Sequence, residues 1–423
     1  MKSGSPLEAA PAAATVVVGA GVVGTACALQ LVRRGHDVIL LDAEAPGSGC
    51  SSGNAGSISC QSVVPIALPG MLGQVPGWLT DPEGPLHVRW RYLPRAFPWL
   101  VRWLAASRMS VVRRSSEALK TLLATALEDY AELLGEQAYR RLVRARGQLL
   151  VWESSAPSRS EQVGHQLRER LDVEMQWLTP QEIADLEPAL APIFARGLLL
   201  KRHGHVVDPL GMVQEMAAQF RERGGRIQRG KVVGIRPAEG SGVTLALEGG
   251  AEMAARQIVV AAGAWSHRLA RQVGIAVPLE TERGYHVHLE GAADMCGRPV
   301  MHADRAFIAT QMHDGLRLAG TVEIAGVDAS PRLDRAEVLH RQARRMFPSL
   351  GEVATRKWMG CRPSLPDSIP VIDRCPSSNA IIFAFGHGHL GVTGAARTAR
   401  LVAEMVSGES PSIDLTPYRI TRF

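Results

Sequence analysis

The stretch TVVVGAGVVG at residues 15–24 decides the fold. Its four β-branched residues predict a buried strand, and residues 25–34 follow with the apolar spacing of a helix. Between them, the first glycine permits a tight turn, the second lets the backbone approach a pyrophosphate, and the third lets the helix pack closely on the strand. The free N–H groups that begin the helix then face the phosphates. The pattern predicts a Rossmann-like nucleotide site whose turn comprises Gly19, Gly21, Val22, Val23 and Gly24.

An acidic residue follows this motif at a suitable distance. Residues 38–41 predict a second buried strand, which leaves Asp42 at its tip, eighteen residues after Gly24. A carboxylate at this place suits the two hydroxyls of an adenosine ribose, and it would repel the 2′-phosphate of NADP. The motif and the acid leave NAD and FAD open.

Length and composition indicate a soluble globular protein. With 423 residues, 46% of them hydrophobic and 21% charged, the chain is long enough for two domains that share an interface. The net charge of +6 would attract anionic cofactors or membrane surfaces. This surplus is too small to indicate nucleic acid, and we expect no nucleic-acid partner.

Neither a metal, a disulfide framework nor a membrane span is expected. The six cysteines contain no CxxC pair and no zinc-like spacing, so a reducing cytoplasm fits best. The first fourteen residues lack the separate apolar region of a signal peptide, and they predict a loose tail. Prolines at positions 65, 69 and 76 interrupt the longest apolar stretch.

Three further segments favour FAD, the longer of the two dinucleotides. RQIVVAAGAWS at residues 256–266 predicts a strand that ends in small residues, where backbone can run close to a cofactor. SSGNAGSI at residues 51–58 supplies hydroxyls and exposed amides directly after the ribose-binding strand. GHGHLGVTG at residues 386–394 is a glycine-rich loop that opens a helix over residues 395–406.

Together with GCRPSLPDSIPVI at residues 360–372, these motifs resemble the D-amino-acid dehydrogenase branch of the glutathione-reductase-type flavoproteins. That group also holds D-amino-acid oxidase, glycine oxidase, sarcosine oxidase and hydroxyproline dehydrogenase. The resemblance runs over nearly the whole chain and implies an α/β fold. It implies a Rossmann-like FAD domain built from residues 1–60, 205–275 and 356–423. A mixed-sheet α+β substrate domain would comprise residues 61–204 and 276–355.

The resemblance also implies which residues bind FAD. It places the adenosine at Asp42, Ala43 and the backbone of Val233, and the pyrophosphate at the glycine turn with Ser51 and Ser52. The flavin would contact Asn54, Ala55, Gly56 and the loop residues Gly388, His389, Leu390, Gly391, Val392 and Thr393. Ala262, Gly263 and Trp265 would also bind the dinucleotide. The dipole of the helix after that loop would stabilise the negative charge of the reduced ring. Cys361 lies one residue away from the register of the flavin-linking cysteine of some relatives, so we expect non-covalent FAD.

Arg362 matches the arginine that clamps the substrate carboxylate in the oxidases that the chain resembles. Its guanidinium provides a planar, always charged, two-pronged donor. Such a clamp would hold the α-carbon hydrogen over flavin N5 for hydride transfer, so that orientation replaces a dedicated base. The alternative is that Arg362 forms a structural ion pair, for instance with Asp367.

Four other residues are candidates for the catalytic site. Tyr285 and His286 lie in ERGYHVH at residues 282–288, where a strand would point Tyr285 opposite to His286. The sequence leaves open which face lines the site. His387 and His389 lie in the glycine-rich loop, where a proton donor would be useful or where they could be solvated. His-x-His pairs at 203/205, 286/288 and 387/389 lack a completing carboxylate or cysteine, so we expect no metal.

The segment RWRYLPRAFPWLVRWL at residues 89–104 allows two interpretations. Its tryptophans and arginines are typical of an interfacial membrane anchor, and relatives that reduce quinones are membrane-associated. We favour a helix with its tryptophans packed inward and its arginines solvated. Peripheral contact with the inner face of a membrane remains the alternative location for a cytoplasmic protein.

The resemblance implies dehydrogenation of a small D-amino or cyclic imino acid, with electrons passed to a quinone or a carrier protein. The terminal loop and the RPSLPDS run are most similar to relatives that oxidise proline and hydroxyproline, which favours D-proline or cis-4-hydroxy-D-proline. Two alternatives are an oxygen-using oxidase of the glycine or sarcosine type, and a non-catalytic flavin-binding subunit of a heteromeric dehydrogenase. The presence of Arg362 and of the complete terminal loop argues against the second.

Overall fold

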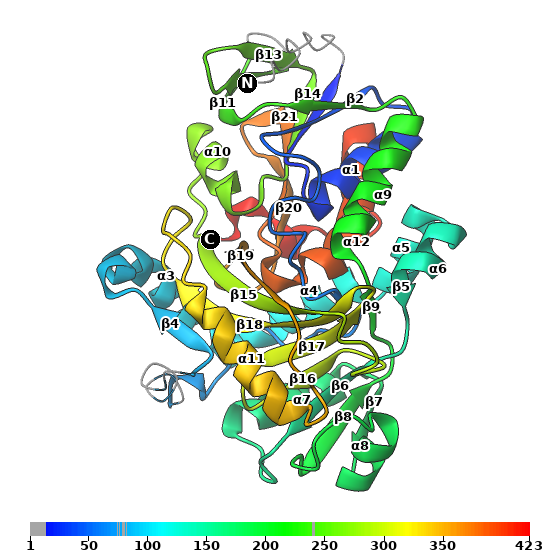
Figure 1. Ribbon diagram of the computed structural model, residues 1–423. Coiled ribbons are helices and arrows are strands. Elements are labelled where there is room, and N and C mark those ends of the chain that lie inside the picture. Colours follow the sequence, from blue (N-terminus) through cyan, green and yellow to red (C-terminus); the bar gives the residue numbers. More distant parts are fainter. Residues whose placement is uncertain (1–13, 74, 76, 78–80, 82, 239–241) are drawn as a thin grey trace.

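The computed structural model describes residues 14–423 apart from 74, 76, 78–80, 82 and 239–241. Residues 1–13, which hold nearly all of the expected N-terminal tail, lie outside the described part of the chain. Two large sheets organise the described residues, one near the top and one near the bottom of Figure 1. This arrangement confirms the expected α/β fold, in which a Rossmann-like sheet is joined to a mixed sheet.

The first sheet has the strand order β10-β2-β1-β14-β21-β20. Its first five strands are parallel, and β20 runs antiparallel to β21. The strands are β1 (Thr15–Val18), β2 (Val38–Asp42), β10 (Arg226–Arg229), β14 (Gln257–Val260), β20 (Val371–Cys375) and β21 (Ser378–Phe385). β1 is buried along its whole length, as expected for a parallel strand that is covered on both faces.

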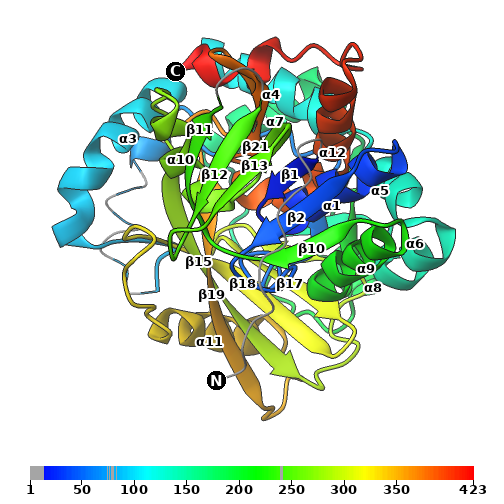
Figure 2. The ribbon, with the colours of Figure 1, turned by 90° about the horizontal axis from the view of Figure 1, so that it is seen from above.

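Different layers cover the two faces of this sheet (Figure 2). One layer consists of α1 (Val22–Arg33), α9 (Pro209–Glu222) and α12 (Gly391–Ser407). The other consists of α10 (Ser266–Gln272) and a small sheet of β11 (Val232–Pro237), β12 (Val243–Leu247) and β13 (Glu252–Ala255). Val17 packs in the helical layer, and Val16 and Val18 pack in the opposite one. Because α1 follows β1 directly in the chain, the turn between them lies at the carboxyl end of the parallel strands, where such sheets bind ligands.

The second sheet has the order β19-β15-β18-β17-β16-β6-β8-β7, with β4 beside β18. Its strands are β4 (Leu86–Val88), β6 (Gln148–Trp152), β7 (Met175–Leu178), β8 (Arg196–Leu200), β15 (Glu280–Glu290), β16 (Val300–His302), β17 (Phe307–Met312), β18 (Gly315–Ile324) and β19 (Thr355–Ser364). The pairing is antiparallel except for β16 with β6 and β18 with β4. Helix α11 (Asp334–Met346) packs on the face formed by Val287, Leu289 and Leu318.

The predicted domain boundaries differ from this packing in two places. Residues 356–364 were expected in the FAD domain, but β19 pairs with β15 of the second sheet over its whole length. The expected substrate-domain range 61–204 includes α4 (Met109–Leu123), α5 (Ala126–Leu134) and α6 (Glu136–Leu142), which share a core with α1 and α12. Tyr130 of α5 is fully buried there, and its hydroxyl donates to Val392 O at 2.6 Å.

Short elements connect these layers. A third sheet has the order β3-β9-β5 and comprises β3 (Ser57–Ile58), β5 (Val143–Arg144) and β9 (Gly204–Val206). The remaining α-helices are α3 (Leu93–Ala106), α7 (Arg159–Arg170) and α8 (Pro180–Leu186). Single 3-10 turns lie at Met71–Gly73, Trp90–Tyr92, Gly263–Trp265, Gly388–Leu390, Thr416–Tyr418 and Ile420–Arg422.

Helix α3 lies at the edge of the molecule, on the left of Figure 1. Trp99 packs inward, and its Nε1 donates to Ser364 O at 3.3 Å. The expectation of inward-packed tryptophans is wrong for Trp90, which is 71% exposed, and Phe97 is 61% exposed. None of the helices in the described residues is long and apolar enough to cross a membrane.

Candidate active site

A cavity of about 1210 Å³ opens between the first sheet and the second. Most of the expected cofactor residues line it: Gly19, Gly21, Val22, Val23, Asp42, Ala43, Ser51, Asn54, Ala55, Val233, Ala262, Gly263, Trp265, Gly388, His389, Leu390, Gly391, Val392 and Thr393. Gly24, Ser52 and Gly56 are not among its lining residues. Ser52 Oγ instead donates to Gly49 O at 2.9 Å, and a Cβ on Gly56 would lie 2.4 Å from Val206 O.

The glycine turn has the close packing that a nucleotide site requires. Gly19 has a φ of +107°, and a Cβ there would lie 2.4 Å from Ala261 O. A Cβ on Gly24 would lie 1.8 Å from Gly19 O, so only glycine lets α1 approach β1 this closely. Gly21 has an ordinary φ of −70° and faces the cavity, so glycine is needed here because its lack of a side chain lets a ligand approach the backbone.

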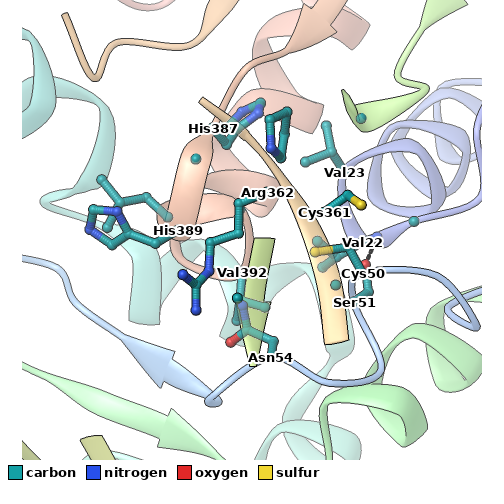
Figure 3. A pocket seen from close by; sticks show the side chains of 18 of the residues that line it. Val22, Val23, Cys50, Ser51, Asn54, Cys361, Arg362, His387, His389 and Val392 are labelled. Atoms are coloured by element: carbon teal, nitrogen blue, oxygen red, sulfur yellow. Dashed lines mark hydrogen bonds between the residues drawn. The ribbon is translucent and has the colours of Figure 1, made fainter. Parts of the chain in front are cut away.

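Backbone donors fix the two polar side chains next to this turn. Asp42 accepts hydrogen bonds from Ala20 N at 2.6 Å and from Glu44 N at 3.0 Å. Ser51 Oγ accepts one from Val22 N at 2.9 Å (Figure 3). A carboxylate, a hydroxyl and a helix N-terminus at the carboxyl edge of a parallel sheet suit the ribose and pyrophosphate of a dinucleotide. The cavity therefore fits FAD.

The loop that carries Asn54 is pinned to the second sheet. Arg317 Nη1 donates to Ser52 O at 3.0 Å and to Asn54 O at 2.8 Å, and His286 Nδ1 donates to Gly53 O at 2.9 Å. Trp358 stacks on His286 with ring centroids 4.9 Å apart, and a Cβ on Gly53 would lie 2.3 Å from the indole. Arg317 and Trp358 were not predicted, because no local pattern shows which strand residues reach a distant loop.

Arg362 projects from β19 into the cavity, toward the space beside His389 and Asn54 (Figure 3). Its guanidinium lies directly over Gly284, where a Cβ would be 2.3 Å from Cζ, so only glycine leaves room for it. The alternative partner Asp367 instead pairs with Arg422 at 2.8 Å. Within the described residues Arg362 makes no hydrogen bond or ion pair, which leaves its donors free for a carboxylate.

The buried Glu282 stands opposite Arg362 in the pairing of β15 with β19. Burial raises the pKa of its carboxyl, an effect that the charge of Arg362 opposes. Burial and the positive charge therefore act on this carboxyl in opposite directions. Glu282 also lines the cavity, although no sequence motif singles it out.

Tyr285 was expected to be a catalytic candidate, and it is among the residues that line the cavity, so this role stays a prediction. Its side chain lies on the face of β15 away from Arg362, and it is 1% exposed. Its hydroxyl donates to Glu323 Oε2 at 2.5 Å and accepts from Arg332 N at 3.0 Å. Tyr285 therefore belongs to a buried network under the sheet.

The three histidine candidates differ. His286 is buried under Trp358, and burial lowers its pKa to about 3, so it positions the Gly53 loop. His387 is also buried, and its Nε2 shares a hydrogen bond of 2.9 Å with Thr398 Oγ1 of α12. Both histidines therefore support the local structure. His387 also lines the cavity, whereas His286 is not among its lining residues, and a catalytic role of either stays a prediction.

His389 faces the cavity beside Arg362 (Figure 3). Surrounding protein lowers its pKa to about 4, and the charge of Arg362 adds to this effect. His389 is therefore neutral near pH 7. Four of the five expected catalytic residues line the cavity, namely Tyr285, Arg362, His387 and His389, and the charge of Arg362 acts on His389.

A polar network joins the start of α12 to the second sheet. Gln148 Oε1 accepts hydrogen bonds from Ser57 Oγ at 2.8 Å and from His203 Nδ1 at 3.3 Å. Ser59 N donates to Thr393 Oγ1 at 3.1 Å, and Ser59 Oγ donates to the same glutamine oxygen at 3.3 Å. The network holds β3 against the loop expected to contact the flavin.

The chain matches the protein-family model described as DAO, FAD dependent oxidoreductase, over residues 14–405. A D-amino-acid oxidase of Bradyrhizobium diazoefficiens is 39% identical over 414 residues, which cover 96% of this chain and 98% of that protein. A D-amino acid dehydrogenase 2 of Pseudomonas aeruginosa is 32% identical over 410 residues, which cover 95% and 96% respectively.

Solved structures show the same fold. Glycine oxidase from Geobacillus kaustophilus superposes with a TM-score of 0.73 at 22% identity, covering 97% of this chain and 98% of that one. L-proline dehydrogenase from P. horikoshii gives a TM-score of 0.73 at 18% identity, covering 97% of each chain. With the nucleotide turn, Asp42 and the cavity in place, the chain belongs to the DAO family of FAD-dependent oxidoreductases.

Proposed function

We propose that the protein oxidises small D-amino or cyclic D-imino acids at the bond between the α-carbon and nitrogen. The observation that carries the proposal is the guanidinium of Arg362, which enters the cavity over Gly284 and makes no hydrogen bond or ion pair with any residue that the structure describes. The names of the relatives support the substrate class, because proteins 39% and 32% identical to this chain are a D-amino-acid oxidase and a D-amino acid dehydrogenase.

In this proposal, FAD supplies the acceptor for the hydride that leaves the α-carbon. Arg362 binds the substrate carboxylate through two N–H groups, and this grip orients the α-carbon hydrogen. Neutral His389 adds a hydrogen-bonding wall without a second positive charge. Because no side chain is assigned as base, the substrate amine must lose its ammonium proton before transfer.

We further propose D-proline and cis-4-hydroxy-D-proline as substrates, on the strength of the sequence motifs, and a quinone or carrier protein as electron acceptor. The oxidase alternative is supported by the name of the 39% identical relative. Peroxide formation during turnover in air separates the two. We propose non-covalent FAD, and acid precipitation tests this, because the flavin should remain in the supernatant.

Exposed apolar side chains on helix α3 and on the turn before it support the proposal that the protein contacts the inner face of a membrane. Trp90, Phe97, Val101 and Leu104 are 71%, 61%, 49% and 40% exposed. Residues 84–116 contain seven arginines and no Asp or Glu. Exposed apolar side chains among arginines suit an anionic lipid surface, and such a location would bring the cavity near a quinone.

The test of the function is anaerobic reduction of the bound flavin, followed at its visible absorbance maximum. D-amino acids, their L-enantiomers, glycine, sarcosine and hydroxyproline isomers are compared at equal concentration. We expect D-isomers to bleach the flavin and L-isomers to be slower. If no amino or imino acid reduces the flavin of fully loaded protein, the proposed function is wrong.

A further inference from the structure

A second guanidinium lines the same cavity as Arg362. Arg168 lies in the last turn of α7, on the side of the cavity formed by the second sheet. Apolar side chains line this region with it, namely Val64, Leu150, Leu200 and Met301. A positive charge among apolar walls is unfavourable unless an anion accompanies it.

Among the described residues, the carboxylate that acts on Arg168 is that of Glu161, and it forms no ion pair with the guanidinium. In the part of the chain that the structure describes, its side chain makes no hydrogen bond or ion pair. Burial lowers the pKa of its guanidinium to about 10, so it is still charged at neutral pH. The nearby Glu161 is already engaged by Ser158 N at 2.6 Å and by Arg196 Nη2 at 3.3 Å.

The surroundings of Arg168 connect it to the expected flavin position. His203 lines the same cavity as Arg168, and burial and the charge of Arg168 both lower its pKa. His203 Nε2 accepts from Gln61 N at 3.2 Å, and its Nδ1 belongs to the Gln148 network that reaches Thr393. Arg168 and Arg362 therefore enter one cavity from different elements, α7 and β19.

We propose that Arg168 binds a carboxylate on the substrate side chain, so that the preferred substrates are D-amino acids with acidic side chains. This inference rests on the proposed oxidation of D-amino acids, and it ranks acidic D-amino acids above the D-proline and cis-4-hydroxy-D-proline proposed from the sequence motifs. Arg362 takes the α-carboxylate, and Arg168 takes the second carboxylate. The neutral ring of D-proline leaves Arg168 without an anion, so D-proline becomes the weaker substrate.

Matched pairs of substrates test the inference on the unaltered holoenzyme. D-glutamate is compared with D-glutamine, and D-aspartate with D-asparagine, because each pair differs in charge while size is nearly constant. We expect kcat/KM for flavin reduction to be roughly 10- to 100-fold higher for the acid, the range for one charge-assisted hydrogen-bonding pair. D-2-aminoadipate extends the series and reports how far Arg168 lies from the reacting carbon.

Variants then assign the preference to Arg168. Arg168→Gln should remove the preference for D-glutamate and leave the rate with D-glutamine nearly unchanged. Arg168→Glu should reverse it toward D-lysine and D-ornithine. Arg170→Gln removes an exposed cation from the same helix, where it pairs with Glu117, and should keep the preference. FAD content and melting temperature confirm that each variant is folded.

The possible failures are distinguishable. Equal kcat/KM for D-glutamate and D-glutamine in the unaltered enzyme overturns the inference and leaves the proposed function intact. The same conclusion follows if Arg168→Gln slows both substrates equally. If neither D-amino acids nor cyclic D-imino acids reduce the flavin of fully loaded protein, both the proposed function and this inference are wrong.

Discussion

At the scale of single residues, the site depends on which side chains are left without partners. Among the described residues, no side chain occupies the donors of Arg362, because Asp367 pairs with Arg422 and because Gly284 leaves space for the guanidinium. Tyr285 follows Gly284 on β15, but its side chain belongs to a buried network with Glu323. Adjacent strand positions therefore have opposite roles, since successive side chains point to opposite faces.

Substitution of Arg362 should impair both binding and reduction. Arg362→Lys keeps the charge but loses the planar two-pronged donor, and Arg362→Ala leaves the carboxylate without a counter-charge. We expect weaker substrate binding, and a limiting rate of flavin reduction lowered by about tenfold or more because the α-carbon is misplaced. Rapid-mixing measurements against substrate concentration separate the two effects. An Arg362→Ala protein with unaltered affinity and rate would show that the carboxylate is held elsewhere.

At the scale of elements, a short loop joins the two sheets. Arg317 of β18 and His286 of β15 hold three consecutive carbonyl groups, at residues 52–54, and Trp358 of β19 covers Gly53. The second sheet thereby positions the backbone expected to contact the flavin. The position of this loop is fixed by side chains from strands more than 200 residues away in sequence.

Gly53→Ala tests this coupling. The new methyl group would meet the Trp358 ring, so the loop must shift, and we expect FAD binding to weaken by about 1–3 kcal/mol. The global fold should persist. Gly351→Ala is the control, because a Cβ there meets nothing within 4 Å. Equal FAD affinity of the two variants in fluorescence titrations would show that the loop does not position the cofactor.

The apolar surface of α3 predicts binding to anionic vesicles. We expect the protein to float with vesicles that contain phosphatidylglycerol and to remain unbound with phosphatidylcholine alone. Phe97→Glu places an acid in the middle of the exposed surface and should abolish flotation without changing flavin reduction. Trp177→Glu is the control, since Trp177 of β7 is 46% exposed outside α3. Unchanged flotation of the Phe97 variant would argue against α3 as the contact surface.

At the scale of the whole molecule, the sequence predicted what depends on local order. The turn at Gly19, Asp42 at the tip of β2 and the loop before α12 are strand ends and helix starts, and their patterns predict their positions. Residues that reach the site from distant elements could not be predicted, because β19 and α7 meet the cavity only through folding. Arg168, Arg317 and the division of packing at residues 109–142 belong to this second group.

The buried histidines predict that the folded protein loses stability in acid. Burial lowers the pKa of His387 to about 4 and that of His203 to about 3, whereas an unfolded chain titrates near 6.5. Between pH 6.5 and about 4 the unfolded state therefore binds more protons, so the free energy of unfolding falls as the pH falls. Above pH 6.5 these histidines are neutral in both states and contribute no slope.

A single variant isolates one of these contributions. His387→Asn removes a buried titrating group, so its unfolding free energy should fall less steeply with acid than that of the unaltered protein. The difference between pH 7 and pH 4 should be at most about 3 kcal/mol. Thermal unfolding midpoints measured across this pH range test the prediction. Parallel curves for the His387 variant and the unaltered protein would show that burial of His387 does not resist protonation.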